Sequence, residues 1–168
     1  MKIEFFDNDG IPNSYCELEG EKYRVRSEVL ILKGDKVYLK KSNVKNQYDR
    51  YYKIPGGSVE PDYGVIETSI KEAQEESRIN IKNCKELGFI TQRYKTIPEW
   101  HKRLLWTKGL KYVGCMTYIC VAEYQNKYTG YIKPEDQEEE MLHGNWYSIN
   151  ELTKEHREAI RKYYSRKL

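Results

Sequence analysis

The sequence predicts an α+β fold in a single domain that spans residues 1–168. Three observations support this prediction. Segments with the residue pattern of strands occur in both halves of the chain, one helical pattern stands near the middle, and a second ends the chain. No internal repeat or low-complexity linker divides the sequence, and 168 residues are enough to bury one core.

The N-terminal part is predicted to consist of strands. Residues 1–6 and 15–20 look like short strands around the turn signal "DNDG". Residues 23–33 and 36–41 look like a hairpin whose turn falls at Gly34-Asp35. These segments would supply the first part of a sheet.

The remaining elements are two helices with two strands between them. Residues 65–77 have helical spacing, and residues 86–94 and 111–124 are predicted strands, the second apolar enough to be central. Residues 148–168 are predicted to form a terminal helix. Its apolar stripe consists of Leu152, His156, Ala159, Ile160 and Tyr163.

The composition favours a soluble cytoplasmic protein. Hydrophobic residues make up 39% and charged residues 33%, and the net charge of +3 permits anionic ligands without favouring nucleic acid. No signal peptide and no apolar run of membrane-spanning length is present, so no membrane partner is expected. The four cysteines form no C-x-x-C pair and are expected to be reduced thiols.

Three glutamates, at positions 72, 75 and 76, lie in the predicted helix of residues 65–77. Residues three and four apart share a helix face, and like charges about 4 Å apart repel by roughly 4 kcal/mol at an effective dielectric near 20. A cation is therefore expected among them, and magnesium prefers such oxygen ligands. The alternative is a solvated acidic face. The preceding Gly56 and Gly57 favour the metal, because glycine lets the backbone approach a metal or phosphate closely.

The stretch "GGSVEPDYGVIETSIKEAQEESRI" resembles the Nudix box of the Nudix hydrolases, whose pattern is G-x5-E-x7-R-E-U-x-E-E-x-G-U, with U an aliphatic residue. Aligned on "EAQEE", the box runs from Gly57 to Ile79 with the family's own spacing. The segment "YYKIPGG" is similar to the approach to the box in many members, and "NWYSINEL" to a late element of the domain.

The resemblance implies a Nudix-like α/β/α sandwich with a mixed β-sheet, and hydrolysis of a nucleoside diphosphate linked to another moiety. By this likeness Glu72 and Glu76 would be the principal ligands of Mg²⁺, for which Mn²⁺ could substitute. Glu75 would assist them, and the Gly57 carbonyl would complete the site. Many relatives are dimers, which leaves a homodimer open.

A general base is expected on a loop after the box. Glu139 and Glu140, which precede Trp146, are the candidates by position, although Glu72 serves as the base in some relatives' proposed mechanisms. The alternative for this acidic run is a solvated loop.

Three positions depart from the family pattern: Tyr63 replaces its first glutamate, Lys71 its arginine and Arg78 its late glycine. In relatives the glutamate and arginine brace the loop and helix through charged contacts. Arginine at position 78 predicts that the helix ends without the left-handed turn that glycine favours. These changes bear on rate and rigidity more than on metal binding.

Substrate recognition is expected outside the box. The segment of residues 95–111 is long for a connection, and Trp100 and Trp106 could stack a base while Arg103 meets phosphate. The equal alternative is an amphipathic segment packed over the core. The other residues predicted to contact a nucleotide substrate are Lys53, Arg93 and Tyr94.

Positive charge just before the box is also predicted to face the cleft, or else to form a solvated strand edge: Lys40, Lys41, Lys45 and Arg50 join Lys53 there. Two further functions stay open from the sequence. One is a nucleotide-binding module that does not cleave its ligand, and the other is an enzyme or binder of RNA 5′ ends.

Overall fold

The computed structural model describes residues 2–6, 14–46, 49–60, 62–134 and 143–167. Nine strands of this part of the chain form a mixed sheet. Strands β3 (Glu21–Lys33) and β8 (Tyr112–Lys127) run parallel to each other at its centre, and β7 (Ile79–Arg93) pairs antiparallel with β8. The predicted central position of the second long apolar strand is confirmed.

The N-terminal strands extend the sheet on one side. Strand β1 (Glu4–Phe5) pairs with β2 (Ser14–Leu18), which pairs with β3, so both short strands predicted from the sequence are present. The hairpin from β3 to β4 (Lys36–Lys41) turns at Gly34, whose φ of 62° explains the glycine. Strand β5 (Tyr52–Lys53) and strand β9 (Asn145–Ser148) both pair antiparallel with β4.

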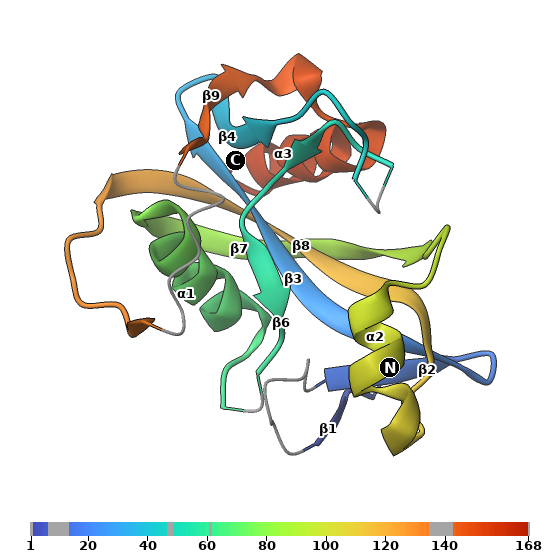
Figure 1. Cartoon of the computed structure of the whole chain (residues 1–168). Helices are drawn as coiled ribbons and strands as arrows, with labels where there is room; N and C mark the ends of the chain where they lie inside the picture. Colours follow the sequence, from blue (N-terminus) through green and yellow to red (C-terminus); the bar gives the residue numbers. More distant parts are fainter. Residues whose placement is uncertain (1, 7–13, 47–48, 61, 135–142, 168) are drawn as a thin grey trace.

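Two helices cover opposite faces of the central strands (Figure 1). Helix α1 (Val65–Ser77) has the predicted bounds, and its Ala73 packs against Val29 and Ile31 of β3. Alternate residues of β3, Leu30 and Leu32, face the other side, where helix α3 (Lys154–Lys167) packs. This alternation follows from the period of two along a strand. The predicted α/β/α sandwich is confirmed.

The terminal helix is shorter than predicted. The predicted helix of residues 148–168 begins at the last residue of β9 and continues into a short 3-10 turn (Ile149–Glu151). Helix α3 begins only at Lys154. The Ser148 hydroxyl accepts a hydrogen bond from the Asn150 N–H, a local contact that favours a turn over a helix here. The apolar stripe is nevertheless right, since all five of its residues are buried, namely Leu152, His156, Ala159, Ile160 and Tyr163.

The long connection between β7 and β8 contains helix α2 (Glu99–Leu104) and a 3-10 turn (Trp106–Lys108). Its Leu105 is fully buried with Tyr112, and Tyr94 and Trp100 pack against this pair. This segment therefore packs on the rest of the fold, while Trp100 and Trp106 remain half-buried. Within the described residues, no helix is long and apolar enough to cross a membrane.

Candidate functional site

Strand β6 (Gly56–Ser58) carries the glycines of the Nudix-like stretch into the sheet. It pairs antiparallel with β3, placing Gly57 opposite Ser27 and Gly56 opposite Glu28. A Cβ added at Gly56 would lie 2.4 Å from the Ser27 carbonyl oxygen, so no larger residue fits without a backbone shift. The first glycine is thus required for close packing of two strands.

The second glycine is required by a carboxylate. A Cβ added at Gly57 would lie 2.5 Å from Glu72 Oε1. The Glu72 carboxylate therefore packs directly against the Gly57 backbone. The Gly56 N–H in turn donates to Glu76 Oε2 at 3.4 Å, and Glu76 is only 6% exposed. Two of the three predicted metal ligands therefore converge on the backbone of Gly56 and Gly57.

Hydrogen bonds to strand β3 hold helix α1 in this position. Ser27 of β3 donates its hydroxyl to the Val65 carbonyl at 3.1 Å and shares a hydrogen bond with the Ser69 hydroxyl. Because these contacts fix the first two turns against the sheet, the glutamates one and two turns later project toward the glycines.

The third glutamate has a different neighbour. Glu75 Oε1 lies 3.7 Å from Lys71 Nζ, and Lys71 also bonds Glu60 Oε1 at 2.7 Å. Among the residues that the structure describes, no group of three or more His, Cys, Asp or Glu side chains is arranged tightly enough to hold a metal by itself. What the residues provide is a pair of carboxylates with the Gly57 backbone beside them. This suits a hard cation such as magnesium, which usually keeps several waters and takes one or two carboxylates.

The two family departures Tyr63 and Lys71 contact each other. Lys71 Nζ lies 5.2 Å from the centroid of the Tyr63 ring, and Tyr63 is 40% exposed. A cation–π contact thus joins the two positions whose family residues form a charged brace. Together with Gln74, Glu75 and residues of the 128–133 segment, they line a cavity of about 220 Å³.

The expectation for Arg78 is wrong. Helix α1 does end in a left-handed turn, with Arg78 at φ 57° and ψ 40°, and its N–H caps the carbonyls of Ala73 and Gln74. The Arg78 carbonyl accepts the Tyr128 N–H at 2.8 Å. The cap bonds and this strand contact hold the arginine in a conformation that glycine would adopt more readily.

A buried charge cluster adjoins the glycines and was not anticipated from the sequence. Glu28, opposite Gly56, accepts a hydrogen bond from Arg26 Nη1 at 2.6 Å. Its two carboxylate oxygens also accept from Arg50 Nη1, Oε2 at 3.2 Å and Oε1 at 3.3 Å. His156 Nε2 lies 3.5 Å away, and its Nδ1 is bonded to the Tyr52 hydroxyl at 2.8 Å. Burial alone would raise the pKa of Glu28, but Arg26, His156 and Arg50 together hold that pKa well below its usual range. The available signal was Glu28 itself, a glutamate directly before the apolar run of residues 29–32.

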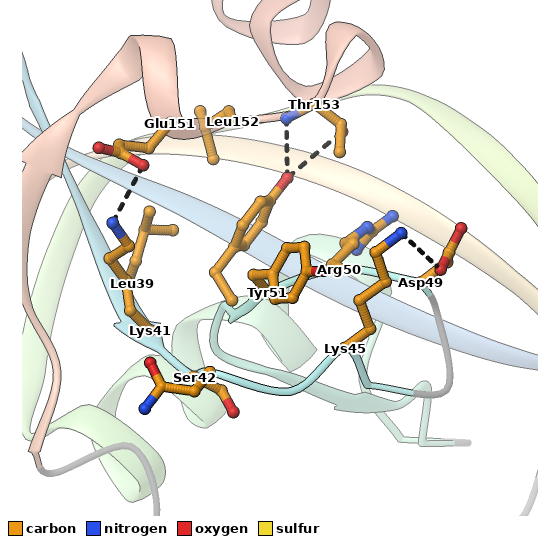
Figure 2. A pocket seen from close by; sticks show the side chains of 12 residues that line it. Leu39, Lys41, Ser42, Lys45, Asp49, Arg50, Tyr51, Glu151, Leu152 and Thr153 are labelled. Atoms are coloured by element: carbon orange, nitrogen blue, oxygen red, sulfur yellow. Dashed lines mark hydrogen bonds and ion pairs between the residues drawn. The ribbon is translucent and has the colours of Figure 1, made fainter.

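A cavity of about 680 Å³ opens on the α3 side of this cluster. Figure 2 shows Lys41 and Glu151 at one end of it, Lys45, Asp49 and Arg50 at the other, and Tyr51 between them. The ion pairs are Lys41 Nζ–Glu151 Oε2 at 3.1 Å and Lys45 Nζ–Asp49 Oδ1 at 3.3 Å. Three of the residues predicted to bring positive charge to a cleft therefore do line one.

Aromatic residues of the β7–β8 connection and of the start of β8 surround a buried histidine, His101. Trp100, Trp106 and Tyr112 make ring contacts with His101 at centroid distances of 5.6, 6.4 and 5.2 Å. His101 Nε2 accepts the Tyr112 N–H at 2.9 Å, and burial lowers the pKa of the imidazole, which keeps it neutral. These contacts pack the rings around the histidine.

The other predicted substrate contacts are spread over the surface. Arg93, at the end of β7, forms a two-point ion pair with Glu21, and the Tyr94 hydroxyl is bonded to Cys115 Sγ. Lys53 is exposed on β5 and Arg103 on α2. Of the six residues predicted to contact substrate, none lines the 680 Å³ cavity. Glu139 and Glu140, the predicted bases, lie outside the described residues.

The glycines, the convergent carboxylates and the sandwich are features of one family. The NUDIX domain profile matches residues 22–167, so the chain belongs to the Nudix family, as an enzyme of the pyrophosphohydrolase type. No curated protein sequence matches the chain.

Solved structures agree with the fold. A Nudix hydrolase from Nitrosomonas europaea is 16% identical with a TM-score of 0.52, over 86% of this chain and 90% of that one. A MutT Nudix hydrolase from Burkholderia pseudomallei is 18% identical with a TM-score of 0.52, over 84% and 98%. An ADP compounds hydrolase is 12% identical with a TM-score of 0.52, over 99% and 94%.

Proposed function

We propose that this protein is a magnesium-dependent hydrolase of nucleotide pyrophosphates, in which Glu72 and Glu76 hold the metal beside the Gly57 carbonyl. One observation carries the proposal: the Glu72 carboxylate lies against Gly57 while Glu76 is bonded to the Gly56 N–H. A solvated acidic helix face would need neither the glycines nor the burial of Glu76.

The chain's own residues would position the reacting groups. When bound, magnesium neutralises the pyrophosphate and stabilises the charge that develops on the transferred phosphorus. The Gly56–Gly57 backbone lies against two carboxylates at one edge of α1, and the absence of a Cβ at Gly57 makes room for the Glu72 carboxylate. Glu75, one turn from Lys71, would assist through water. Glu139 or Glu140 would accept the proton of the attacking water, with Glu72 as the alternative base.

Replacing Glu76 by glutamine tests the catalytic assignment. Turnover should fall by at least about 100-fold in a panel of nucleoside triphosphates, sugar nucleotides and dinucleoside polyphosphates assayed with magnesium or manganese. Glu67→Gln, an exposed change in the first turn of the same helix, is the matched control and should retain activity. Full activity of the Glu76 variant, or no hydrolysis of any substrate by the wild type, would show the proposal to be wrong.

Replacing Glu72 by glutamine tests the metal site without relying on turnover. A neutral amide keeps the shape of the side chain but removes a charge from the ion, so magnesium affinity should fall about 10-fold or more. Calorimetric titration with magnesium measures this directly, and thermal unfolding without metal should be nearly unchanged. An unaltered magnesium affinity would remove Glu72 from the ligand set.

A further inference from the structure

Two of the four cysteines lie close to each other on neighbouring strands. Cys84 is on β7 and Cys120 on β8, and these strands pair antiparallel with Glu86 opposite Cys120. Cys84, two residues before Glu86, faces the same side of the sheet as Cys120 and packs against the apolar cluster that contains it. All four thiols are free. We propose that Cys84 and Cys120 form a site of reversible oxidation, at which a hydroperoxide converts the two thiols into a disulfide.

The strand that carries Cys84 is irregular at this point. Two residues of β7, Asn83 and Cys84, stand opposite one residue of β8, Ala122, so β7 has a bulge here, and Asn83 has a φ of 53°. Diagonal neighbours in a regular pair of strands are roughly 7–8 Å apart, and a disulfide needs Cα atoms about 4.4–6.8 Å apart. Because the bulge releases Cys84 from the regular ladder, a small backbone shift closes this difference.

The two thiols differ in acidity and in access to solvent. A hydrogen bond from the Cys84 thiol lowers the pKa of Cys120; burial opposes this effect, and the hydroxyls of Ser69 and Ser27 add to it. Ser27 Oγ lies 3.9 Å from Cys120 Sγ. Cys84, whose pKa is raised by its contact with Cys120 and by burial, is the half-buried member, whereas Cys120 is fully buried. A peroxide therefore reaches the Cys84 sulfur first, and Cys120 ionises more readily.

The reaction with hydrogen peroxide balances over two steps. The Cys84 sulfur attacks one peroxide oxygen, the O–O bond breaks, and Cys84 becomes a sulfenic acid while the other oxygen leaves as water with the thiol proton. The Cys120 thiolate then attacks the Cys84 sulfur. The S–S bond forms, the S–O bond breaks, and the leaving hydroxide becomes a second water by taking up the proton that Cys120 lost. The two sulfurs together lose two electrons, which reduce the peroxide.

The pair lies on the α1 side of the sheet. Ala73 of α1 belongs to the same apolar cluster as Cys120, and the Ser27 hydroxyl beside Cys120 Sγ donates to the Val65 carbonyl at the start of α1. Oxidation would therefore occur directly beneath the helix that carries the predicted metal ligands. The modification needs neither a metal nor a nucleotide, so it is independent of the proposed function.

Hydrogen peroxide added to the reduced full chain, with chelator to remove metals, tests the site. After alkylation in denaturant, mass spectrometry should show that two of the four thiols are lost, that one peptide pair is linked through Cys84 and Cys120, and that dithiothreitol restores both thiols. Cys84→Ser should keep all its remaining thiols. Cys120→Ala should stop at a sulfenic acid on Cys84, which dimedone traps. Circular dichroism confirms that both variants are folded.

The other two cysteines supply matched controls. Cys16 is buried in a different apolar cluster, and Cys115 Sγ is hydrogen-bonded to the Tyr94 hydroxyl at 3.3 Å. Cys16→Ala and Cys115→Ala should each lose two thiols and give the same linked peptides as the wild type. The proposal is overturned if the wild type keeps four thiols at peroxide concentrations that oxidise a free cysteine peptide, if the disulfide joins other cysteines or two chains, or if Cys84→Ser also loses two thiols.

Discussion

Arg78 shows how a single residue can keep a family conformation without the family side chain. It sits in the left-handed region at φ 57°, where a Cβ is disfavoured by about 1–2 kcal/mol. Its N–H caps two carbonyls of α1 and its carbonyl holds Tyr128, so the surrounding bonds impose the conformation. A strained cap remains where glycine would be relaxed.

Replacing Arg78 by glycine should therefore stabilise the protein by up to about 1 kcal/mol, after subtraction of the larger unfolded-state entropy of glycine. For a chain of this length that corresponds to a rise in Tm of about 2–4 °C. Thermal unfolding followed by circular dichroism checks it. Arg78→Ala is the control, because alanine keeps the Cβ and should give no such gain; a lower Tm for the glycine variant would contradict the strain.

The position of the Tyr63 ring outside the core can also be tested with a single substitution. Because it is exposed and contacts Lys71, a glutamate there would replace a cation–π contact with an ion pair to the same lysine. Tyr63→Glu should change the free energy of unfolding by less than about 0.5 kcal/mol and turnover only modestly. Urea unfolding measures the first effect. Tyr112→Glu, at a 1% exposed position, should by contrast prevent folding; the same result at Tyr63 would mean that its ring belongs to the core.

At the scale of elements, helix α2 joins aromatic packing to the N-terminal strands. Its Trp100 is in contact with Arg24 of β3 and with His101, and Phe6 and Tyr15 pack on the same cluster. A ring in this environment contributes apolar burial whether or not a ligand is present.

Trp100→Ala should consequently lower the free energy of unfolding by about 1–3 kcal/mol, less than for a fully buried tryptophan, and leave KM nearly unchanged. Chemical unfolding and steady-state kinetics on the same variant measure both. Leu104→Ala, on an exposed position of the same helix, should alter neither. If KM rises 10-fold at unchanged stability, Trp100 contacts substrate as its sequence context suggested.

The predictability of the elements follows in part from their length, although β7 (Ile79–Arg93), whose pairing with β8 is irregular before residue 89, was predicted only from residue 86. Strands β3, β4 and β8 and helix α1 carry enough period-two or helical signal to be identified from sequence, and β3 and α1 flank Gly56 and Gly57. Strands β5, β6 and β9 have two to four residues and form only because long neighbours offer them backbone hydrogen bonds. The cleft was only partly predictable: its cations were noted, but Tyr51 and Thr153 meet only through tertiary packing.

Across the whole molecule, the β3–β8 layer separates two apolar clusters, one under α1 and one under α3. Glu28 lies on the β3 strand that both clusters share, opposite Gly56 of β6, with Arg26 and Arg50 as its partners. A carboxylate buried with its cations adds little net stability compared with an apolar core, but its removal leaves buried positive charge. The fold and the site therefore depend on the same ion cluster.

This dependence predicts how stability changes with pH. The folded-state pKa of Glu28 lies below the unfolded value near 4.3, so its contribution is fully present above that value and is lost as the pH falls toward the folded pKa. Glu28→Gln should cost about 3–5 kcal/mol at neutral pH, and the difference from wild type should shrink below about pH 4. Urea unfolding at several pH values measures it. Glu17→Gln, exposed on β2, should follow the wild type throughout, and a pH-independent Glu28 difference would mean that charge is not what the cluster contributes.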